Sequence, residues 1–262
     1  MSEASAGYFR SGLPYNRFGR GPRPLVIFQG LMFENKPQSG LALGMYNFLR
    51  QDYTAYSVLR KPGLPPGYTL GDMAGDYATM IRDEFGGPVD MIGISTGGSI
   101  VQHFAADHPE LLRRLVIHSS AYTLSEPAKA AQMEVGRLAS QRRWREAWAT
   151  LLGFVLPPGP LSRLETGLAS LLLSLHPPKD PSDLVITIEA EDRFNFKDRL
   201  AEITAPTLLV AGDRDPFYSE ALFRETVAGI PNAKLILYPG MGHPASGKQF
   251  ERDMLAFLRE ES

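Results

Sequence analysis

Short apolar runs alternate with helical patterns along most of this chain, and this alternation limits the fold more than any other feature of the sequence. Residues 25–28 are entirely apolar and are followed by Gln29 and Gly30, which is typical of a strand buried on both faces. Residues 7–21 are expected to form a short hairpin before it. Further strands are predicted at 53–59, 89–94, 115–118, 207–211 and 235–238.

Helices are predicted between these strands. Residues 69–86 place apolar side chains at three- and four-residue steps, and Thr69 with Asp72 resembles a capping box at their start. Ser246 and Gln249 suggest a second capping box at the start of the final helix. Strands that alternate with helices form a mostly parallel sheet with helices on both faces, so we predict an α/β fold. The other helices are expected at 96–108, 219–228 and 246–259.

The strand signal disappears between residues 121 and 200. Leu, Ala, Arg and Trp dominate there, and proline-rich turns at 157–160 and 177–178 separate three or four short helices. We therefore divide the chain into an α/β core, residues 1–120 and 201–262, and an inserted helical segment, residues 121–200. Ligands bind at the carboxyl ends of the strands in open α/β sheets, so this small insertion is expected to lie over the site as a lid.

Composition excludes several classes of function. Lys and Arg number 27 against 29 Asp and Glu, a net charge of −2, so the chain lacks the basic surplus of a nucleic-acid binder or a polybasic membrane-surface protein. The chain has no Cys, and hence no disulfide, Cys nucleophile or thiolate metal site. No apolar run approaches the ~20 residues that span a bilayer. Residues 1–7 lack a signal-peptide pattern, so we expect a cytoplasmic protein.

A candidate nucleophile lies at the junction of a predicted strand and a predicted helix. Residues 93–97, Gly-Ile-Ser-Thr-Gly, match the pattern G-x-S-x-G. The pattern is weak by itself because Gly and Ser are common in this chain, but a strand before it and a helix after it give it meaning. A tight strand-to-helix turn exposes the Ser95 hydroxyl and directs the amides of the helix N-terminus at the reacting centre. Ser95 is therefore the predicted nucleophile.

A serine nucleophile needs a base, and one histidine is placed to serve as one. His243 lies in the loop between the last strand and the last helix, at the sheet edge where Ser95 is expected. We therefore predict that His243 is the base. The other four histidines fall within or beside helices and strands, where structural roles are usual: His103, His108, His118 and His176.

Two carboxylates are candidates for orienting the base. Residues 211–216, Ala-Gly-Asp-Arg-Asp-Pro, follow the predicted strand 207–211 at its carboxyl end. Asp213 comes directly after the strand glycine and also suits an ion pair with Arg214 or a turn cap. Asp215 lies two residues further out, nearer the mouth of the site, and we favour it over Asp213.

Together these segments resemble the α/β-hydrolase fold superfamily, in its lid-bearing single-domain branch, from about residue 8 onward. The chain order Ser95, Asp215, His243 is the order of that architecture. The resemblance implies hydrolysis of a carboxylic ester through an acyl-enzyme, with no cofactor and no metal. We accordingly expect a carboxylesterase that acts on a small to medium apolar ester, as a monomer or a homodimer with no nucleic-acid or membrane partner.

The same resemblance implies where the oxyanion would be bound. Family members usually have His-Gly after the third strand, and the next residue supplies a backbone amide; that role carries over to Leu31, paired with the Thr96 amide. Here Gln29 stands in place of the usual His. The Gln29 side chain either contacts the substrate or makes a structural hydrogen bond to the loop.

An apolar pocket is expected beside these residues. The candidates come from the loop expected to bind the oxyanion, from the loop that carries Asp215, and from the aromatic residues of the inserted segment. The aromatic side chains could equally pack the core or the inserted segment. The candidate substrate-binding residues are Gln29, Met32, Phe33, Trp144, Phe154 and Phe217.

Other chemistry is compatible with the same three residues. A lactonase, a thioesterase, a C–C bond hydrolase or a cofactor-free perhydrolase uses a similar triad, and some relatives are ligand receptors with little or no turnover. Multiple turnover distinguishes an enzyme from a receptor. A panel of esters, lactones and dienoates distinguishes the enzymes from one another.

Overall fold

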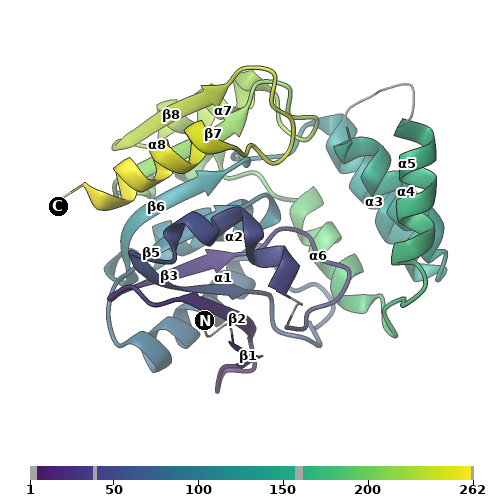
Figure 1. Ribbon diagram of the computed structural model, residues 1–262, viewed down its shortest axis with the longest axis horizontal. Coiled ribbons are helices and arrows are strands. Elements are labelled where there is room, and N and C mark those ends of the chain that lie inside the picture. The colour runs from purple at the N-terminus through teal and green to yellow at the C-terminus, as the bar shows by residue number, and fades with distance from the viewer. Residues whose placement is uncertain (1–4, 38–39, 157–161, 261–262) are drawn as a thin grey trace.

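The computed structural model describes residues 5–37, 40–156 and 162–260, which contain one eight-stranded sheet (Figure 1). The strands are β1 (Ser5–Tyr8), β2 (Pro14–Gly19), β3 (Arg23–Phe28), β4 (Tyr53–Val58), β5 (Val89–Ile94), β6 (Leu112–His118), β7 (Thr207–Gly212) and β8 (Ala233–Tyr238). They lie in the order β1-β2-β4-β3-β5-β6-β7-β8. β1 is antiparallel to β2 and β2 to β4, and every other neighbouring pair is parallel. The predicted hairpin and the mostly parallel sheet are therefore confirmed.

Helices cover both faces of the sheet, as predicted (Figure 1). The α-helices are α1 (Leu70–Phe85), α2 (Thr96–Asp107), α3 (Glu126–Ser140), α4 (Trp144–Val155), α5 (Ser162–Leu173), α6 (Ser182–Asp192), α7 (Glu220–Gly229) and α8 (Lys248–Arg259), and the 3-10 helices are η1 (Gly40–Leu49), η2 (Pro109–Leu111) and η3 (Lys197–Glu202). Val26 and Phe28 pack with α1, α2 and α7 on one face, and Leu25 and Ile27 pack with η1 and α8 on the other. Both faces of β3 are buried, which is why its run is apolar throughout.

The two predicted capping boxes had different outcomes. The box at the start of α1 is confirmed, because Asp72 N donates to Thr69 Oγ1 at 3.1 Å and Thr69 N donates to Asp72 Oδ2 at 2.9 Å. The box at the start of α8 is wrong. Helix α8 begins after Gly247, whose φ of 108° favours glycine, and no side chain caps it. Ser246 therefore lies outside the helix and caps nothing there.

The inserted helical segment follows β6 and precedes β7. Its described residues contain the four helices α3 to α6 and no strand. In Figure 1, α3, α4 and α5 stand apart from the sheet, and α6 lies between this group and the core. Helix α3 packs against α4 and α6, and α4 packs against α5. The boundary of this segment as a domain, and its action as a lid, stay predictions.

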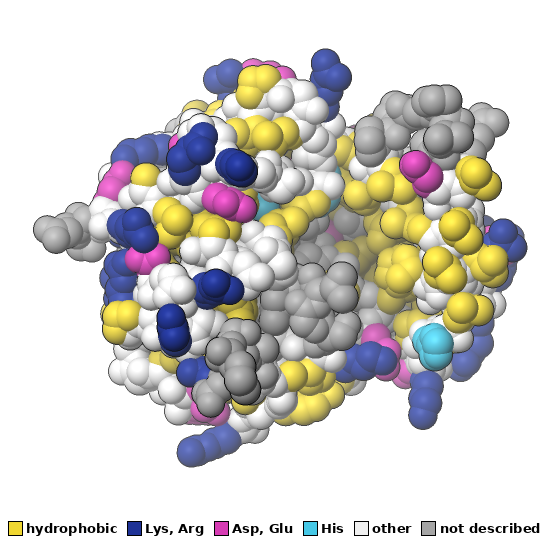
Figure 2. All heavy atoms as spheres, viewed as in Figure 1, with side chains coloured by type: hydrophobic (Ala, Val, Ile, Leu, Met, Phe, Trp, Pro, Cys, Tyr) yellow, Lys and Arg dark blue, Asp and Glu magenta, His cyan; other side chains and the backbone are white. Residues whose placement is uncertain are grey.

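Helix α5 presents an apolar surface to the outside, visible in Figure 2 as hydrophobic side chains over that helix. Its exposed leucines, with one just beyond the helix, are Leu164, Leu168, Leu171, Leu172, Leu173 and Leu175. Such a patch is the first surface to examine for self-association, and the expected monomer or homodimer stays a prediction. Within the described residues, no helix combines the length and the apolar composition that a membrane crossing requires.

Candidate active site

Ser95 lies at the turn between β5 and α2 in an unusual backbone conformation. Its φ is 53° and its ψ is −124°, a region that non-glycine residues rarely adopt. The turn also needs a glycine two residues later, because a Cβ at Gly97 would lie 2.0 Å from the carbonyl oxygen of Phe28. The strained turn that the pattern at residues 93–97 predicts is therefore present, with Ser95 at its tip.

Three of the predicted residues form a hydrogen-bonded line. His243 Nε2 lies 3.0 Å from Ser95 Oγ, and His243 Nδ1 lies 2.7 Å from Asp215 Oδ2. The second oxygen of Asp215 accepts from the backbone amides of Phe217 at 2.8 Å and Tyr218 at 3.2 Å. The Asp215 carboxylate is thereby held in one orientation. With the Nδ1 proton donated to Asp215, Nε2 is free to accept the Ser95 proton.

The two candidate carboxylates have different hydrogen-bond partners. Asp215 contacts His243, whereas Asp213 is exposed and accepts from the backbone amide of Gly240 at 2.6 Å. Asp213 therefore links the loop after β7 to the loop after β8 and does not reach the histidine.

A second, buried histidine supports the loop that carries His243. His118 Nε2 donates to the carbonyl oxygen of Ala245 at 2.8 Å, and Tyr46 Oη donates to His118 Nδ1 at 2.7 Å. Ser119 Oγ accepts from the Ala245 amide at 3.1 Å. Burial lowers the pKa of His118 to about 3, so the ring is neutral and both of its nitrogens hold neighbours in place. A structural role for His118 was expected from the sequence, but these partners were not.

The lowered pKa of His118 predicts how stability depends on pH. The unfolded chain binds a proton at the ordinary pKa of 6.5, while folded His118 does not bind one until about 3. Stability is therefore lost as the pH falls through this window, by about 1.4 kcal/mol per pH unit from this residue. We expect the urea unfolding free energy of His118→Gln to depend less steeply on pH than that of the wild type between pH 6.5 and 4.5.

The comparison isolates His118 because the other titrating groups are shared by both proteins. His103 and His108 also have pKa values lowered by burial, and they contribute equally to the wild type and the variant. In His118→Gln the new amide would keep a donor for the Ala245 carbonyl oxygen without titrating. Equal slopes for the two proteins would contradict the assignment.

The loop expected to bind the oxyanion lies against Ser95. A Cβ at Gly30 would come within 3.2 Å of Ser95 Cβ, so this backbone passes directly beside the hydroxyl. Arg60, which is buried, donates through Nη1 to the carbonyl oxygens of Gln29 at 3.1 Å and Gly30 at 3.0 Å. Those contacts fix the peptide units that precede Leu31. The assignment of the Leu31 and Thr96 amides to the oxyanion stays a prediction.

Gln29 makes a structural hydrogen bond, but to a neighbouring strand rather than to the loop expected from the sequence. Its Nε2 donates to Ser57 Oγ on β4 at 2.8 Å. The side chain therefore ties the end of β3 to the neighbouring strand. A contact between Gln29 and a substrate stays a prediction.

Two of the predicted pocket residues are linked to the histidine by ring contacts. The Phe217 ring centre is 4.6 Å from that of His243, and the Phe154 ring centre is 4.9 Å from that of Phe217. Phe154 belongs to α4, so the inserted helical segment contributes an aromatic side chain next to the acid loop. Phe217 thus packs on the His243 ring, and Phe154 packs on Phe217.

The other aromatic candidates pack the inserted helical segment against the core. Phe33 stacks on Trp148 with ring centres 3.6 Å apart and lies 6.2 Å from Trp144. Phe33 and Trp144 are both buried in a cluster with side chains of α3 and α6, while Met32 is half-buried. Phe33 and Trp144 thus help to pack the inserted helical segment against the core. Contact of Phe33, Trp144 or Met32 with a substrate stays a prediction.

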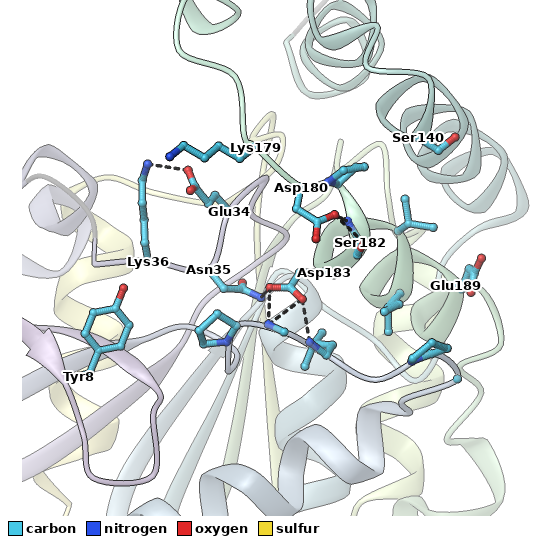
Figure 3. Close-up of a pocket in the computed structure, with 18 residues that line it drawn as sticks. Tyr8, Glu34, Asn35, Lys36, Ser140, Lys179, Asp180, Ser182, Asp183 and Glu189 are labelled. Carbon is cyan, nitrogen blue, oxygen red and sulfur yellow. Dashed lines mark hydrogen bonds and ion pairs between the residues drawn. The ribbon is translucent and has the colours of Figure 1, made fainter.

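A groove of about 900 Å³ lies where the inserted helical segment meets the core (Figure 3). At its centre the carboxylate of Asp183, in the first turn of α6, accepts from the amides of Gly63 and Leu64 at 3.0 and 2.8 Å and from Asn35 Nδ2 at 3.3 Å. Asp183 therefore fastens the start of α6 to two core loops. Within the described ranges, no group of three or more His, Asp or Glu side chains is arranged to hold a metal ion.

Two buried ionisable side chains, Arg60 and Glu191, contact the segments beside Ser95 and were not predicted from the sequence. Arg60 lies two residues after the end of β4. Glu191 lies near the end of α6, whose sequence does not separate an apolar from a polar face. Both side chains are 1% exposed or less. A carboxylate that follows a mostly apolar run, residues 184–190, is the only local signal that Glu191 offers.

Comparison with known proteins identifies related sequences. A family model described as the alpha/beta hydrolase family matches residues 11–252. The polyketide synthase ThaQ of Burkholderia thailandensis is 30% identical over 262 residues, covering 93% of this chain but 12% of that protein, so the chain spans a small part of it. The putative carbamate hydrolase RutD of Serratia proteamaculans is 24% identical, with 79% of each chain covered. A 2-hydroxy-6-oxononadienedioate/2-hydroxy-6-oxononatrienedioate hydrolase of Pseudomonas is 24% identical, with 98% of this chain and 95% of that protein covered.

Solved structures share the fold over nearly the whole chain. A hydrolase from Pseudomonas aeruginosa PA01 superposes with a TM-score of 0.80 at 21% identity, covering 98% of this chain and 99% of that chain. The carboxylesterase CesB from Bacillus subtilis superposes with a TM-score of 0.73 at 18% identity, covering 100% of this chain and 93% of that chain. At these identities the likeness concerns the fold.

Proposed function

The chain belongs to the alpha/beta hydrolase family, and we propose that it is a serine hydrolase that cleaves a carboxylic ester through an acyl-enzyme. One observation carries this proposal. Ser95, at a strained turn after a parallel strand, is joined to His243 at 3.0 Å, and His243 is joined to Asp215 at 2.7 Å. Nucleophile, base and orienting carboxylate are thus within hydrogen-bond reach in the order that acyl transfer requires.

The proposed reaction has two halves. His243 Nε2 accepts the Ser95 proton as Ser95 Oγ bonds to the ester carbonyl carbon, and Asp215 stabilises the imidazolium. The Leu31 and Thr96 amides stabilise the tetrahedral oxyanion, a contribution of about 3–4 kcal/mol for each donor. The oxyanion collapses, the C–O bond to the alcohol breaks, and His243 protonates the departing alkoxide. Water then attacks the acyl-enzyme by the same steps and releases the acid.

Apolar side chains beside the histidine support an apolar ester as the substrate. Phe217 packs on the His243 ring, and Phe154 of α4 packs on Phe217. An acyl or alcohol group next to His243 would meet these rings rather than charged side chains. The fold is also that of CesB, which is a carboxylesterase.

A C–C bond or carbamate hydrolase is the second candidate, and the relatives favour it. The Pseudomonas dienedioate hydrolase aligns with nearly the full length of this chain, and RutD is a putative carbamate hydrolase. Both chemistries also attack a carbonyl carbon, so the same three residues suit either. The leaving group, carbon or nitrogen in place of alkoxide oxygen, is what distinguishes these candidates from an esterase.

A substrate panel tests the proposal. The protein is incubated with a fluorophosphonate probe and, separately, with p-nitrophenyl esters of increasing acyl length, a lactone, a thioester, a dienoate and a carbamate. We expect labelling at Ser95 and multiple turnovers on short to medium esters. A higher kcat/KM on the dienoate or the carbamate would replace the esterase assignment by the second candidate. Labelling without turnover on any substrate would favour a ligand receptor, and a folded protein with neither result would overturn the proposal.

A further inference from the structure

We propose that Glu191, on the inserted helix α6, is a positioning residue that holds the first turn of α2, and with it the Thr96 amide, in the geometry needed for catalysis. The proposal rests on the proposed serine-hydrolase function. It assigns the inserted helical segment a role in the reaction besides covering or shaping the site. Glu191 does not contact Ser95 or His243, so any effect on chemistry must pass through α2.

Glu191 uses both carboxylate oxygens on α2. Its Oε2 accepts from Thr96 Oγ1 at 2.7 Å, and its Oε1 accepts from Ser99 Oγ at 3.1 Å. Thr96 and Ser99 are three residues apart and therefore lie on one face of the first helical turn. Thr96 also follows Ser95 directly in the chain, and the backbone amide of Thr96 is the expected oxyanion donor. One carboxylate thus fixes the turn that carries nucleophile and donor.

The surroundings of Glu191 explain why these contacts are strong. The side chain is fully buried, and burial raises its pKa, while hydrogen bonds from Thr96 and Ser99, the charge of Arg60 and a hydrogen bond from Gln132 act in the opposite direction. A buried carboxyl without partners is costly, so the two hydroxyl groups cannot leave it without a penalty. The first turn of α2 is therefore restrained by two hydrogen bonds that are costly to break.

The contacts of Glu191 are not needed merely to fasten α6 to the core. The start of α6 is already fastened by Asp183, which accepts from Gly63, Leu64 and Asn35 at the groove in Figure 3. Asp183 and Glu191 thus sit at opposite ends of one helix. Asp183 contacts residues 63 and 64 and, through Asn35, a position four residues beyond Leu31 in the loop after β3. It makes no hydrogen bond to α2, whereas Glu191 contacts that helix directly. This difference supplies a matched control.

The test compares Glu191→Ala, Glu191→Gln and Asp183→Ala. Active sites are counted with the fluorophosphonate probe, and kcat, KM and the rate of Ser95 labelling are measured per active site. We expect Glu191→Ala to lower kcat and the labelling rate by about 10- to 100-fold with KM nearly unchanged, because a displaced oxyanion donor acts on the transition state. Glu191→Gln keeps one acceptor and offers a donor to the other hydroxyl group, so it should restore kcat to within about threefold of the wild type.

Asp183→Ala should lower the melting temperature but lower kcat per active site by no more than about threefold, because Asp183 bonds neither to α2 nor to the peptide units next to Leu31. Equal falls in kcat for Glu191→Ala and Asp183→Ala would overturn the proposal, since both would then act by loosening α6. A Glu191→Gln variant as slow as Glu191→Ala would also overturn it, because hydrogen bonding would not be the cause.

A variant of Ser99, which donates to Glu191, keeps the proposal testable if Glu191→Ala does not fold. Ser99→Ala removes one of the two hydroxyl donors and should lower kcat by about 3- to 10-fold at nearly constant KM. No change in kcat would count against the proposal. If the wild type is labelled by the probe and hydrolyses the ester, but the variants have the same kcat as one another, only this inference is overturned. A wild type that does neither would overturn the proposed function, and this inference with it.

Discussion

Ser95→Ala is expected to abolish turnover and leave the fold intact. Loss of the nucleophile of a serine triad lowers kcat on the order of 10⁶-fold, because the remaining groups stabilise the transition state without an acyl-enzyme. Alanine keeps the Cβ of Ser95 and removes only the hydroxyl group. The strain at the turn, where φ is 53°, is therefore the same in the variant and the wild type. The folded state should therefore be retained. Measurement of kcat on the best ester of the panel, with mass spectrometry of the probe adduct, checks the expectation.

A second serine serves as the control for Ser95→Ala. Ser140 is exposed at the end of α3, and its hydroxyl donates only to the carbonyl oxygen of Arg137 at 2.8 Å. Ser140→Ala should label and turn over like the wild type. Turnover by Ser95→Ala within about tenfold of the wild type, against the million-fold loss of a missing nucleophile, would show that Ser95 is not the nucleophile.

Asp215→Asn is expected to lower kcat about 10⁴-fold, the loss known for a triad acid converted to its amide. The contacts of Asp215 explain why the amide would be harmful here. Oδ1 accepts from the amides of Phe217 and Tyr218, so an asparagine would keep its carbonyl oxygen on that side and turn its NH₂ group toward His243. An NH₂ group at Nδ1 moves the ring proton to Nε2. The ring could then no longer accept the proton of Ser95.

Asp213→Asn is the matched control, since it makes the same chemical change two residues away. Asp213 accepts from the Gly240 amide, and an asparagine carbonyl oxygen can keep that bond. We expect kcat within about tenfold of the wild type, because the loop after β8 is perturbed and the proton relay is not. A larger loss of kcat in Asp213→Asn than in Asp215→Asn would reverse the assignment of the acid. Kinetics on a single ester, with melting curves for both variants, decides between them.

The local pattern of the sequence was sufficient for much of the fold. Apolar runs predicted the parallel strands, because a strand buried on both faces must be apolar at consecutive positions. The box at the start of α1 was predicted correctly from Thr69 and Asp72, since both partners lie within one helical turn. The box at Ser246 failed because the conformation of Gly247, rather than a nearby donor and acceptor, sets where α8 begins.

The three residues of the proposed triad were also predicted from local patterns. Each one follows the carboxyl end of a parallel strand: Ser95 after β5, Asp215 after β7 and His243 after β8. Parallel strands bring their carboxyl ends to one edge of the sheet, so short motifs far apart in the chain are expected to meet there. The distances of 2.7 and 3.0 Å agree with that expectation.

Contacts between distant side chains were decided only by the tertiary structure. The bond from Gln29 to Ser57 and the packing of Phe33 on Trp148 each depend on which remote group a side chain meets. The bond from Asp213 to the Gly240 amide is another such contact.

Glu191 is the clearest case of such a contact. Its partners lie 95 and 92 residues earlier in the chain, and the mostly apolar run before it does not indicate what it contacts. Strand burial and helix capping act over a few residues and leave a local pattern in the sequence, whereas a buried hydrogen bond across the core leaves none. That is why the sheet and the motifs at its edge were predictable from the chain alone, while the groups that hold them in place required the folded structure.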